Sequence, residues 1–215
     1  MERMKIINGA KFGGILELPI IEKPSSVIIP KFLVPFSERT KIDSSHIAVC
    51  FYEMDKNFSE ILSDPAKYIE ELRKYQAVIS PDFSIYRDDP LFMQIEALSL
   101  GRTIGSFWQR RGLNVIPNIR WGSEDTYTTS VLPEKIAFSG VAKHSIVAVG
   151  SYGCIRRKED RYHFEAGLEA MMNAIEPEIV LVYGAMPEKV FGQYFSMAKF
   201  VQYDNWTKTR HERRF

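Results

Sequence analysis

The sequence predicts an α/β fold in which a mostly parallel sheet carries helices on both faces. From residue 46 onward, short runs rich in Val and Ile alternate with amphipathic stretches of helical length. These runs are apolar throughout, as in parallel strands that are covered on both sides. The length of 215 residues fits a single α/β domain, 1–215.

Six apolar runs have the length and composition of buried strands: 46–52, 77–80, 114–117, 145–149, 178–183 and 199–203. A weaker run, 27–29, lies in a proline-rich region, and we expect residues 1–45 to form an N-terminal cover or an additional edge. Residues 204–215 are expected to be a frayed tail. Because a closed (β/α)₈ barrel usually needs about 250 residues, two arrangements remain open. They are an open doubly wound sheet and a small or incomplete TIM-like barrel.

The connections between these runs carry helix signals. Asp64 and Asp89 each precede a proline, which predicts an N-cap followed by the first helical position. Gly101 and Gly105, four residues apart in the second helix, indicate close packing. The expected helices begin at Pro65, run from Pro90 to Arg111, cover 159–175 and follow Pro187.

The composition excludes several classes of protein and partner. Lys and Arg number 28 against 27 Asp and Glu, so the total charge does not favour nucleic acid as a partner. Arg102, Arg110, Arg111 and the basic cluster at 156–161 keep that partner open as a third alternative. Cys50 and Cys154 stand in no CxxC pair, which argues against a structural zinc site, and no cofactor is indicated. No apolar stretch approaches the roughly 20 residues of a membrane span. We expect a cytoplasmic protein whose oligomeric state the sequence does not specify.

Acidic residues follow two of the expected strands. Parallel sheets bind ligands at the carboxyl ends of their strands. Asp82, after a proline at such an end, is the first candidate for an acid, base or nucleophile, and Asp55 is the second. Since Ser-Pro-Asp is also common in turns, a purely structural role for Asp82 remains open.

Asn118, Arg120 and Trp121 combine an amide, a forked cation and a flat aromatic ring, which suit a planar or anionic ligand. Alternation along the strand sends Asn118 and Arg120 to one side and Trp121 to the other. We expect a polar ligand between Asp82 and Arg120. The alternative is a strand end with Trp121 in the core and Arg120 in a salt bridge.

Further ligand-binding candidates lie in the loops. Gly150, Ser151 and Gly153 separate a strand from a helix, where free backbone N–H groups attract anions, although a tight turn explains them equally well. Arg156 adds positive charge nearby. Ser84 and Arg87 follow Asp82 in the same loop.

Six segments occur in the order typical of one known family: 32–37, 51–55, 80–87, 116–122, 149–154 and 182–184. Over about residues 30–203, the chain resembles a domain-of-unknown-function family (number 4417) of bacteria, phages and integrative elements. The resemblance implies no established activity. It implies these motif positions: Asp82, Ser84, Arg87, Asn118, Arg120, Trp121, Gly122, Gly150 and Gly153.

Two functions fit a phage-type or mobile-element protein with this pattern. The first is an enzyme that acts on a nucleotide, nucleobase or phosphorylated small molecule at the carboxyl ends of the parallel strands. The alternative is a non-catalytic accessory protein that binds a host protein or a small ligand. Whether the chain is an enzyme stays open at this point.

Overall fold

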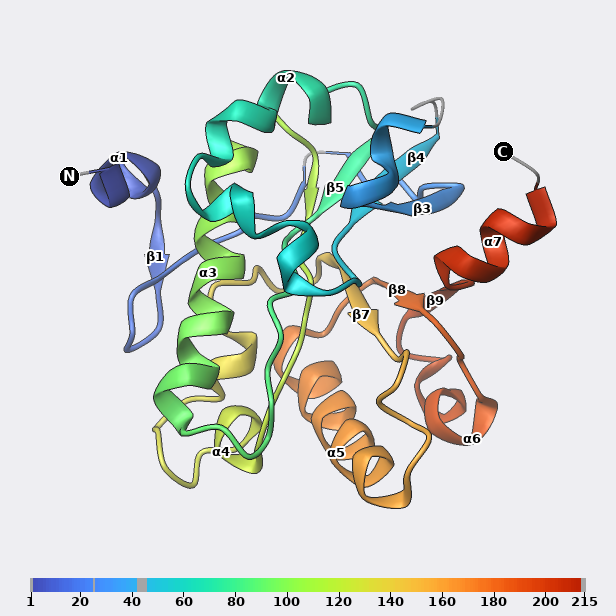
Figure 1. The fold of residues 1–215 in the computed structure, drawn as a ribbon. Coiled ribbons are helices and arrows are strands. Elements are labelled where there is room, and N and C mark those ends of the chain that lie inside the picture. The colour runs from blue at the N-terminus through green and yellow to red at the C-terminus, as the bar shows by residue number, and fades with distance from the viewer. Residues whose placement is uncertain (1, 25, 42–45, 214–215) are drawn as a thin grey trace.

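Seven parallel strands in sequential order form the centre of the protein (Figure 1). The structure is a computed structural model that describes residues 2–24, 26–41 and 46–213. The first sheet contains β3 (Phe32–Pro35), β4 (Ile47–Cys50), β5 (Ala77–Ile79) and β6 (Val115–Ile116). The second contains β7 (Ile146–Gly150), β8 (Ile179–Tyr183) and β9 (Lys199–Tyr203). The predicted parallel sheet is therefore confirmed.

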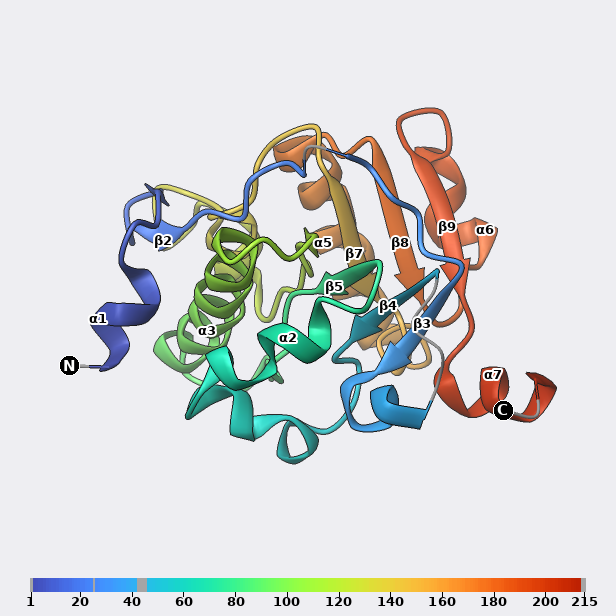
Figure 2. The same cartoon turned by 90° about the horizontal axis from the view of Figure 1, so that it is seen from above.

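Two backbone hydrogen bonds join the sheets edge to edge just beyond β6. Ile119 N donates to the Ala148 carbonyl at 2.7 Å, and Ala148 N donates to the Pro117 carbonyl at 2.9 Å. Figure 2 shows the strands of both sheets arranged side by side around one centre.

The inner face of this seven-stranded array is filled by side chains of the strands themselves. Alternate residues point inward, and together they form one buried cluster: Leu33, Ala48, Cys50, Ala77, Ile79, Ile116, Ile146, Ala148, Leu181, Tyr183 and Tyr203. No helical residue belongs to it. Because the sheet curls around its own side chains, it matches the incomplete TIM-like barrel rather than the doubly wound sheet.

The barrel is left open between its first and last strands. Among the described residues, β3 and β9 form no ladder with each other. The Tyr203 hydroxyl bridges the seam by donating to the Pro30 carbonyl at 2.6 Å. The α/β class is thus confirmed, and the outward side chains of the strands pack with helical residues in two further clusters.

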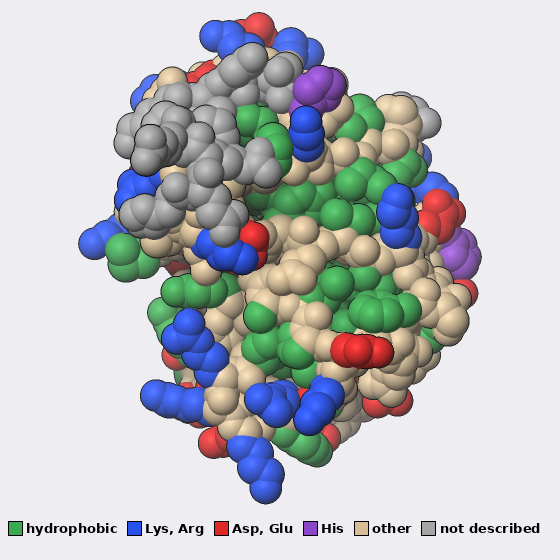
Figure 3. All heavy atoms as spheres, turned by 90° about the vertical axis from the view of Figure 1, so that its right-hand side faces the viewer, with side chains coloured by type: hydrophobic (Ala, Val, Ile, Leu, Met, Phe, Trp, Pro, Cys, Tyr) green, Lys and Arg blue, Asp and Glu red, His purple; other side chains and the backbone are tan. Residues whose placement is uncertain are grey.

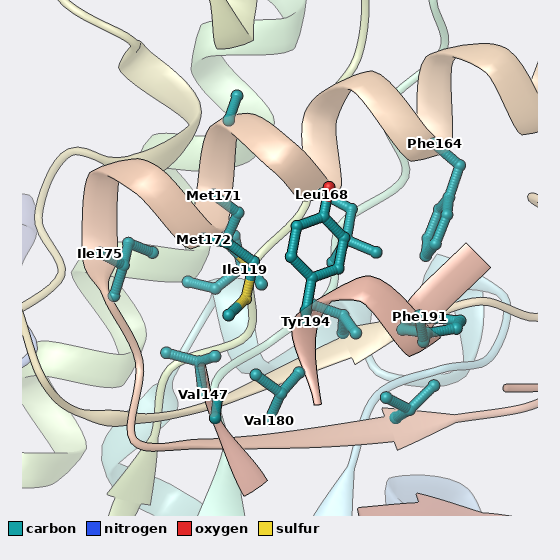
Figure 4. Close-up of a cluster of buried hydrophobic side chains, with 14 of the residues drawn as sticks. Ile119, Val147, Phe164, Leu168, Met171, Met172, Ile175, Val180, Phe191 and Tyr194 are labelled. Carbon is teal, nitrogen blue, oxygen red and sulfur yellow. The ribbon is translucent and has the colours of Figure 1, made fainter. Parts of the chain in front are cut away.

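Helices cover the outer face in two groups. Over the first sheet lie α2 (Ile69–Leu72) and the long α3 (Leu91–Arg110). Over the second lie α5 (Lys158–Ile175) and the short α6 (Glu188–Phe191). Figure 4 shows Leu168 and Met172 of α5 directed toward Val147 and Val180 of the strands. This burial of apolar area is the main force that fixes the helices on the barrel.

Gly101 and Gly105 let α3 approach the end of β5 very closely. A Cβ on Gly101 would lie 2.7 Å from the Pro81 carbonyl oxygen. A Cβ on Gly105 would lie 2.8 Å from Ser80 Cβ and 2.6 Å from Ile21 Cδ1. The predicted close packing is confirmed, and it fixes the segment that carries Asp82.

The N-terminal region differs from the prediction. The weak run 27–29 is not a strand, and the edge strand β3 forms later, at Phe32–Pro35. The pairing of β3 with β4 buries Leu33, Val34 and Pro35, whereas Val27 stays exposed. The edge strand therefore forms at 32–35, where its residues become buried, and not at 27–29. Upstream lie α1 (Glu2–Ile7), β1 (Phe12–Gly13) and β2 (Leu18–Pro19).

Two predicted details of helices also need correction. Asp64 caps the short helical segment Pro65–Tyr68 by accepting hydrogen bonds from Ala66 N and Lys67 N, whereas the N-cap of α3 is Pro90 and has no side-chain cap hydrogen bond. Instead, Gln94 Nε2 donates to the Asp89 carbonyl at 2.7 Å.

Where a frayed tail is expected, α7 (Trp206–Arg213) is present. The remaining short helix is α4 (Glu124–Tyr127), and none of the helices in the described ranges is long and apolar enough to cross a membrane.

Candidate functional site

Four polar side chains from the ends of three neighbouring strands form one hydrogen-bonded chain. Tyr52 follows β4, Asp82 follows β5, and Asn118 and Arg120 follow β6. The Tyr52 hydroxyl donates to Asn118 Oδ1 at 2.9 Å, and Asn118 Nδ2 donates to Asp82 Oδ1 at 2.8 Å. Arg120 Nη1 then donates to Asp82 Oδ2 at 2.8 Å. Asn118 and Arg120, which alternation along the strand places on one side, therefore both donate to the Asp82 carboxylate.

Burial and mutual charge shift the pKa values of these hydrogen-bonded side chains. Asp82 is only 7% exposed, and desolvation raises the pKa of its carboxyl group above the ordinary value. The Arg120 charge and the Asn118 hydrogen bond act in the opposite direction but do not outweigh desolvation. Conversely, the Asp82 charge raises the pKa of Arg120, which stays a cation. Burial also holds the pKa of Tyr52 well above its ordinary value, so its hydroxyl remains a neutral donor.

A cavity of about 470 Å³ opens beside Arg120 at the carboxyl ends of the strands. Its walls come from the loop after β5, the end of β6, the loop after β7 and the first turns of α5. The aromatic side chains Tyr86, Trp121, Tyr152 and Phe164 contribute to the walls. Its volume lies in the range of ordinary small-molecule sites. Asp82 is not among its lining residues, so Arg120 lies between the carboxylate and the cavity.

Trp121 belongs to both the cavity wall and the outer core. Its ring packs against Phe164 at 5.3 Å between centroids, and Nε1 donates to the His163 carbonyl at 3.0 Å. A Cβ on Gly167 would overlap the indole, so this glycine makes room for the ring. The predicted opposite orientation of Trp121 is confirmed, together with the alternative that places it in the core.

Gly150 forms the floor of the cavity next to Tyr52. A Cβ at this position would lie 2.9 Å from two carbons of the Tyr52 ring. That ring stacks on Tyr183 with 4.7 Å between centroids. The ends of β4, β7 and β8 thus meet here, as expected for strand ends on one rim of a parallel sheet.

Asp55, Ser84 and Arg87 hold loops in place. The Asp55 carboxylate accepts bonds from Ser84 N at 3.1 Å and Ser84 Oγ at 2.8 Å. Arg87 lies on the cavity wall but pairs with Asp160 at 2.8 Å and Glu159 at 3.3 Å. These bonds already occupy the groups that would have to contact a ligand.

The loop after β7 separates its predicted residues. Ser151 is buried away from the cavity, and its Oγ donates to the Ala185 carbonyl at 2.6 Å. Gly153 lines the cavity with a φ of 81°, a conformation that favours glycine. Arg156 lies outside the wall, with its guanidinium 5.5 Å from the centre of the Tyr152 ring. Gly153 and Gly150 therefore shape the cavity, and Arg156 belongs to its rim.

Sequence reasoning missed Tyr52 and Arg102. Arg102 is buried and donates to three carbonyls, those of Asn118 at 2.8 Å, Ala137 at 2.9 Å and Ser139 at 3.0 Å. Desolvation lowers the pKa of its guanidinium to about 10. The sequence offered no sign of this role, because its partners are backbone atoms of distant loops. Tyr52 was recognisable only as the last residue of an expected strand.

The part of the chain that the structure describes contains no cluster of side chains that could hold a metal ion. Within residues 2–24, 26–41 and 46–213, no three His, Cys, Asp or Glu side chains gather as a metal site would require.

Comparison with known proteins finds relatives of this chain among phage proteins. It is 29% identical over 139 residues to the Gene 1 proteins of Mycobacterium phages D29 and L5, which covers 65% of this chain. The same alignment covers 49% of the D29 protein and 58% of the L5 protein, so the chain spans about half the length of these curated relatives. No solved structure gives a significant match. The family model for the domain of unknown function DUF4417 matches residues 10–204, and the chain therefore belongs to that family.

Proposed function

We propose that the chain binds a nucleotide, or another phosphorylated molecule with a planar part, in the 470 Å³ cavity at the carboxyl ends of its strands. The observation that carries the proposal is Arg120. This cation lies on the cavity wall, and a buried carboxylate holds it from behind. Its Nη1 is bonded to Asp82, while no described residue is seen to bond its Nη2 or Nε. Those atoms are available to a phosphate or carboxylate oxygen.

The aromatic walls supply the second half of the recognition. Tyr86 and Tyr152 contribute exposed rings from two different loops to the lining, whereas the rings of Trp121 and Phe164 are more buried. Flat rings next to a guanidinium suit a ligand that joins a planar group to an anion. Lys would bind the anion as a point charge, whereas Arg offers a planar fork.

Asp82 supports a catalytic version of this proposal through its environment. An anion bound to Arg120 would compete with Asp82 for the same cation. Because burial already raises the pKa of Asp82, weakening of that ion pair would raise it further and favour uptake of a proton. Asp82 would then act as an acid or base on the bound ligand, with Arg120 as the binding residue.

One observation favours the non-catalytic alternative. Asp82 does not line the cavity, and Arg120 stands between it and any ligand there. A proton could pass only if Arg120 moved. In that alternative the same cavity binds a small ligand and Asp82 only positions Arg120.

The test begins with the ligand itself. Native protein is purified, denatured, and the released small molecules are analysed by mass spectrometry. In parallel, thermal unfolding is followed with the four ribonucleoside monophosphates, their nucleosides and ribose 5-phosphate. A ligand at about 100 times its Kd stabilises the folded state by about 2.7 kcal/mol, which is easily measured.

The decisive variant is Arg120→Lys, which keeps the charge and loses the fork. We expect it to reduce the thermal shift with nucleotides while the unliganded protein unfolds normally. Arg111→Lys is the matched control, because Arg111 is exposed just beyond the far end of α3. Equal shifts in both variants, or equal shifts with nucleosides that lack phosphate, would contradict the proposal. If the protein turns over its ligand, and Asp82→Asn abolishes turnover but keeps ligand binding, the protein is an enzyme that uses Asp82. If the protein binds the ligand without turnover, it is a binding protein.

A further inference from the structure

Two exposed tyrosines stand at the mouth of the cavity on different loops. Tyr86, in the loop after β5, is 65% exposed, and Tyr152, in the loop after β7, is 58% exposed. Both line the cavity. Their rings are not needed to fill the core, and each offers a flat surface to a molecule that arrives from solvent.

Three basic residues continue this rim beyond the cavity. Arg156, Arg157 and Lys158 are all exposed, and Arg156 lies over the Tyr152 ring. Among the described residues, none of the three forms an ion pair. The acids that follow them in sequence, Glu159 and Asp160, pair with Arg87 instead.

On the face drawn in Figure 3, many of the Lys and Arg side chains lie toward one end. Figure 3 shows Lys and Arg side chains gathered toward the lower end, the end at which α5 begins in Figure 1. The chain has a nearly neutral net charge of +1, but the run from Arg156 to Lys158 places three positive charges next to one another. Such a local patch, rather than the total charge, is what a nucleic acid meets.

We infer that this rim, formed by Tyr86, Tyr152, Arg156, Arg157 and Lys158, binds a single-stranded nucleic acid whose unpaired terminal nucleotide enters the cavity. The inference rests on the proposed function, because it names the polymer to which the bound nucleotide belongs. Exposed aromatic rings stack on unpaired bases of any sequence, and interleaved cations follow the phosphates. A free mononucleotide would use the cavity and leave the three basic residues without a role.

The geometry favours a single strand over a duplex. The bases of a duplex are stacked and paired, so their faces cannot lie on Tyr86 or Tyr152 unless the base is extruded. A cavity of about 470 Å³ suits one nucleotide and leaves no room for a base pair with its neighbours. The next phosphates along the strand would then meet the basic residues outside the cavity.

Fluorescence anisotropy with the full chain tests this inference. The probes are labelled oligothymidylate and oligouridylate of about twelve nucleotides, within the usual range of site sizes, and a blunt duplex of equal length. We expect both single strands to bind and the duplex to bind at least tenfold more weakly. Four phosphate contacts, three at the basic residues of the rim and one at Arg120, predict a slope of about −3 for log Kobs against log salt concentration.

Variants connect the binding to the rim. Tyr152→Ala is expected to weaken oligonucleotide binding by about tenfold, the loss typical of one stacked base. The triple variant R156Q/R157Q/K158Q should reduce the salt slope to about −0.7, the share of the remaining Arg120 contact, while mononucleotide binding stays unchanged. Phe12→Ala is the matched aromatic control, because Phe12 is also exposed but lies on β1. R73Q/K74Q/R111Q, three exposed cations near the amino ends of the strands, is the matched charge control.

The outcomes separate the two proposals. Oligonucleotide binding that the rim variants leave intact, or equal affinity for the duplex, overturns the rim inference while mononucleotide binding through Arg120 stands. Absence of any mononucleotide binding overturns the proposed function and, with it, entry of the strand end into the cavity. Capture of proteins rather than oligonucleotides by the rim would also overturn the inference.

Discussion

Arg120 separates Asp82 from the cavity while bonding it at 2.8 Å, so the carboxylate holds the cation and the cation faces the open space. The sequence had predicted a polar ligand between these two residues. Their direct contact corrects that expectation, and the proposed function accordingly places the ligand on the far side of the guanidinium. The pair therefore works as one unit in which the inner residue sets the position of the outer one.

Replacement of Asp82 should show how strongly this unit supports the fold. Asp82→Asn can keep the hydrogen-bonded chain if the Asn118 amide turns over, because the Tyr52 hydroxyl can also accept a bond. We expect a loss of about 1 kcal/mol in the free energy of unfolding. Asp82→Ala leaves Asn118 and Arg120 unpaired and should cost about 3 kcal/mol or more. Urea unfolding measures both, and equal losses would show that the network cannot rearrange.

The pH dependence of stability should carry the signature of Asp82. Because its pKa is raised in the folded state, the folded protein holds this proton more tightly than the unfolded chain. The contribution of Asp82 to the free energy of unfolding is complete below the ordinary carboxyl pKa of about 4. It is lost as the pH rises through the higher pKa of the folded state. Unfolding of the wild type and of Asp82→Asn is compared from pH 4 to 7. The free energy of unfolding of the wild type should rise relative to that of the variant as the pH falls. A relative rise with increasing pH would instead mean that the Arg120 charge outweighs burial in setting the pKa of Asp82.

Close packing of α3 on the barrel predicts a sharp effect at Gly105. A Cβ there would lie within 2.8 Å of both Ile21 and Ser80. Gly105→Ala should therefore destabilise the protein by about 1–3 kcal/mol, although alanine favours a helix more than glycine does. Ser99→Ala, a partly exposed position on the same helix, is the control and should change stability little. Equal stability of the two variants would show that the helix can shift away at no cost.

Gly167 offers a way to disturb the cavity wall from outside. A side chain there would overlap the Trp121 indole, whose ring lines the cavity. Gly167→Ala should displace Trp121, alter the near-ultraviolet circular dichroism, and weaken ligand binding together with stability. The exposed helix position Glu169→Ala provides the control. An unchanged spectrum would show that Trp121 has more freedom than its contacts indicate.

The strands and their direction could be predicted because burial on both sides leaves continuous apolar runs, as at Ile47–Cys50 and Ile179–Tyr183. The same logic correctly placed Asp82, Arg120 and Gly150 on one rim. The partners in the loops could not be predicted, since the path of the backbone decides them. Asp55 meets Ser84, Arg87 meets Asp160, and Ser151 turns to Ala185, each for reasons of loop geometry.

The sequential strand order also bears on how the chain folds during synthesis. Within each sheet every strand pairs with the strand made just before it, from β3 to β6 and from β7 to β9, and an isolated bridge from Asn118 to Ala148 joins the two sheets. Such local pairing shortens the search for native contacts. We expect the first sheet, complete at Ile116, to form while the second is still inside the ribosome, and nascent chains stalled beyond it to resist protease over residues 47–116. The Asp82–Arg120 pair would then be in place before Gly150 and Tyr152 emerge to close the opposite wall.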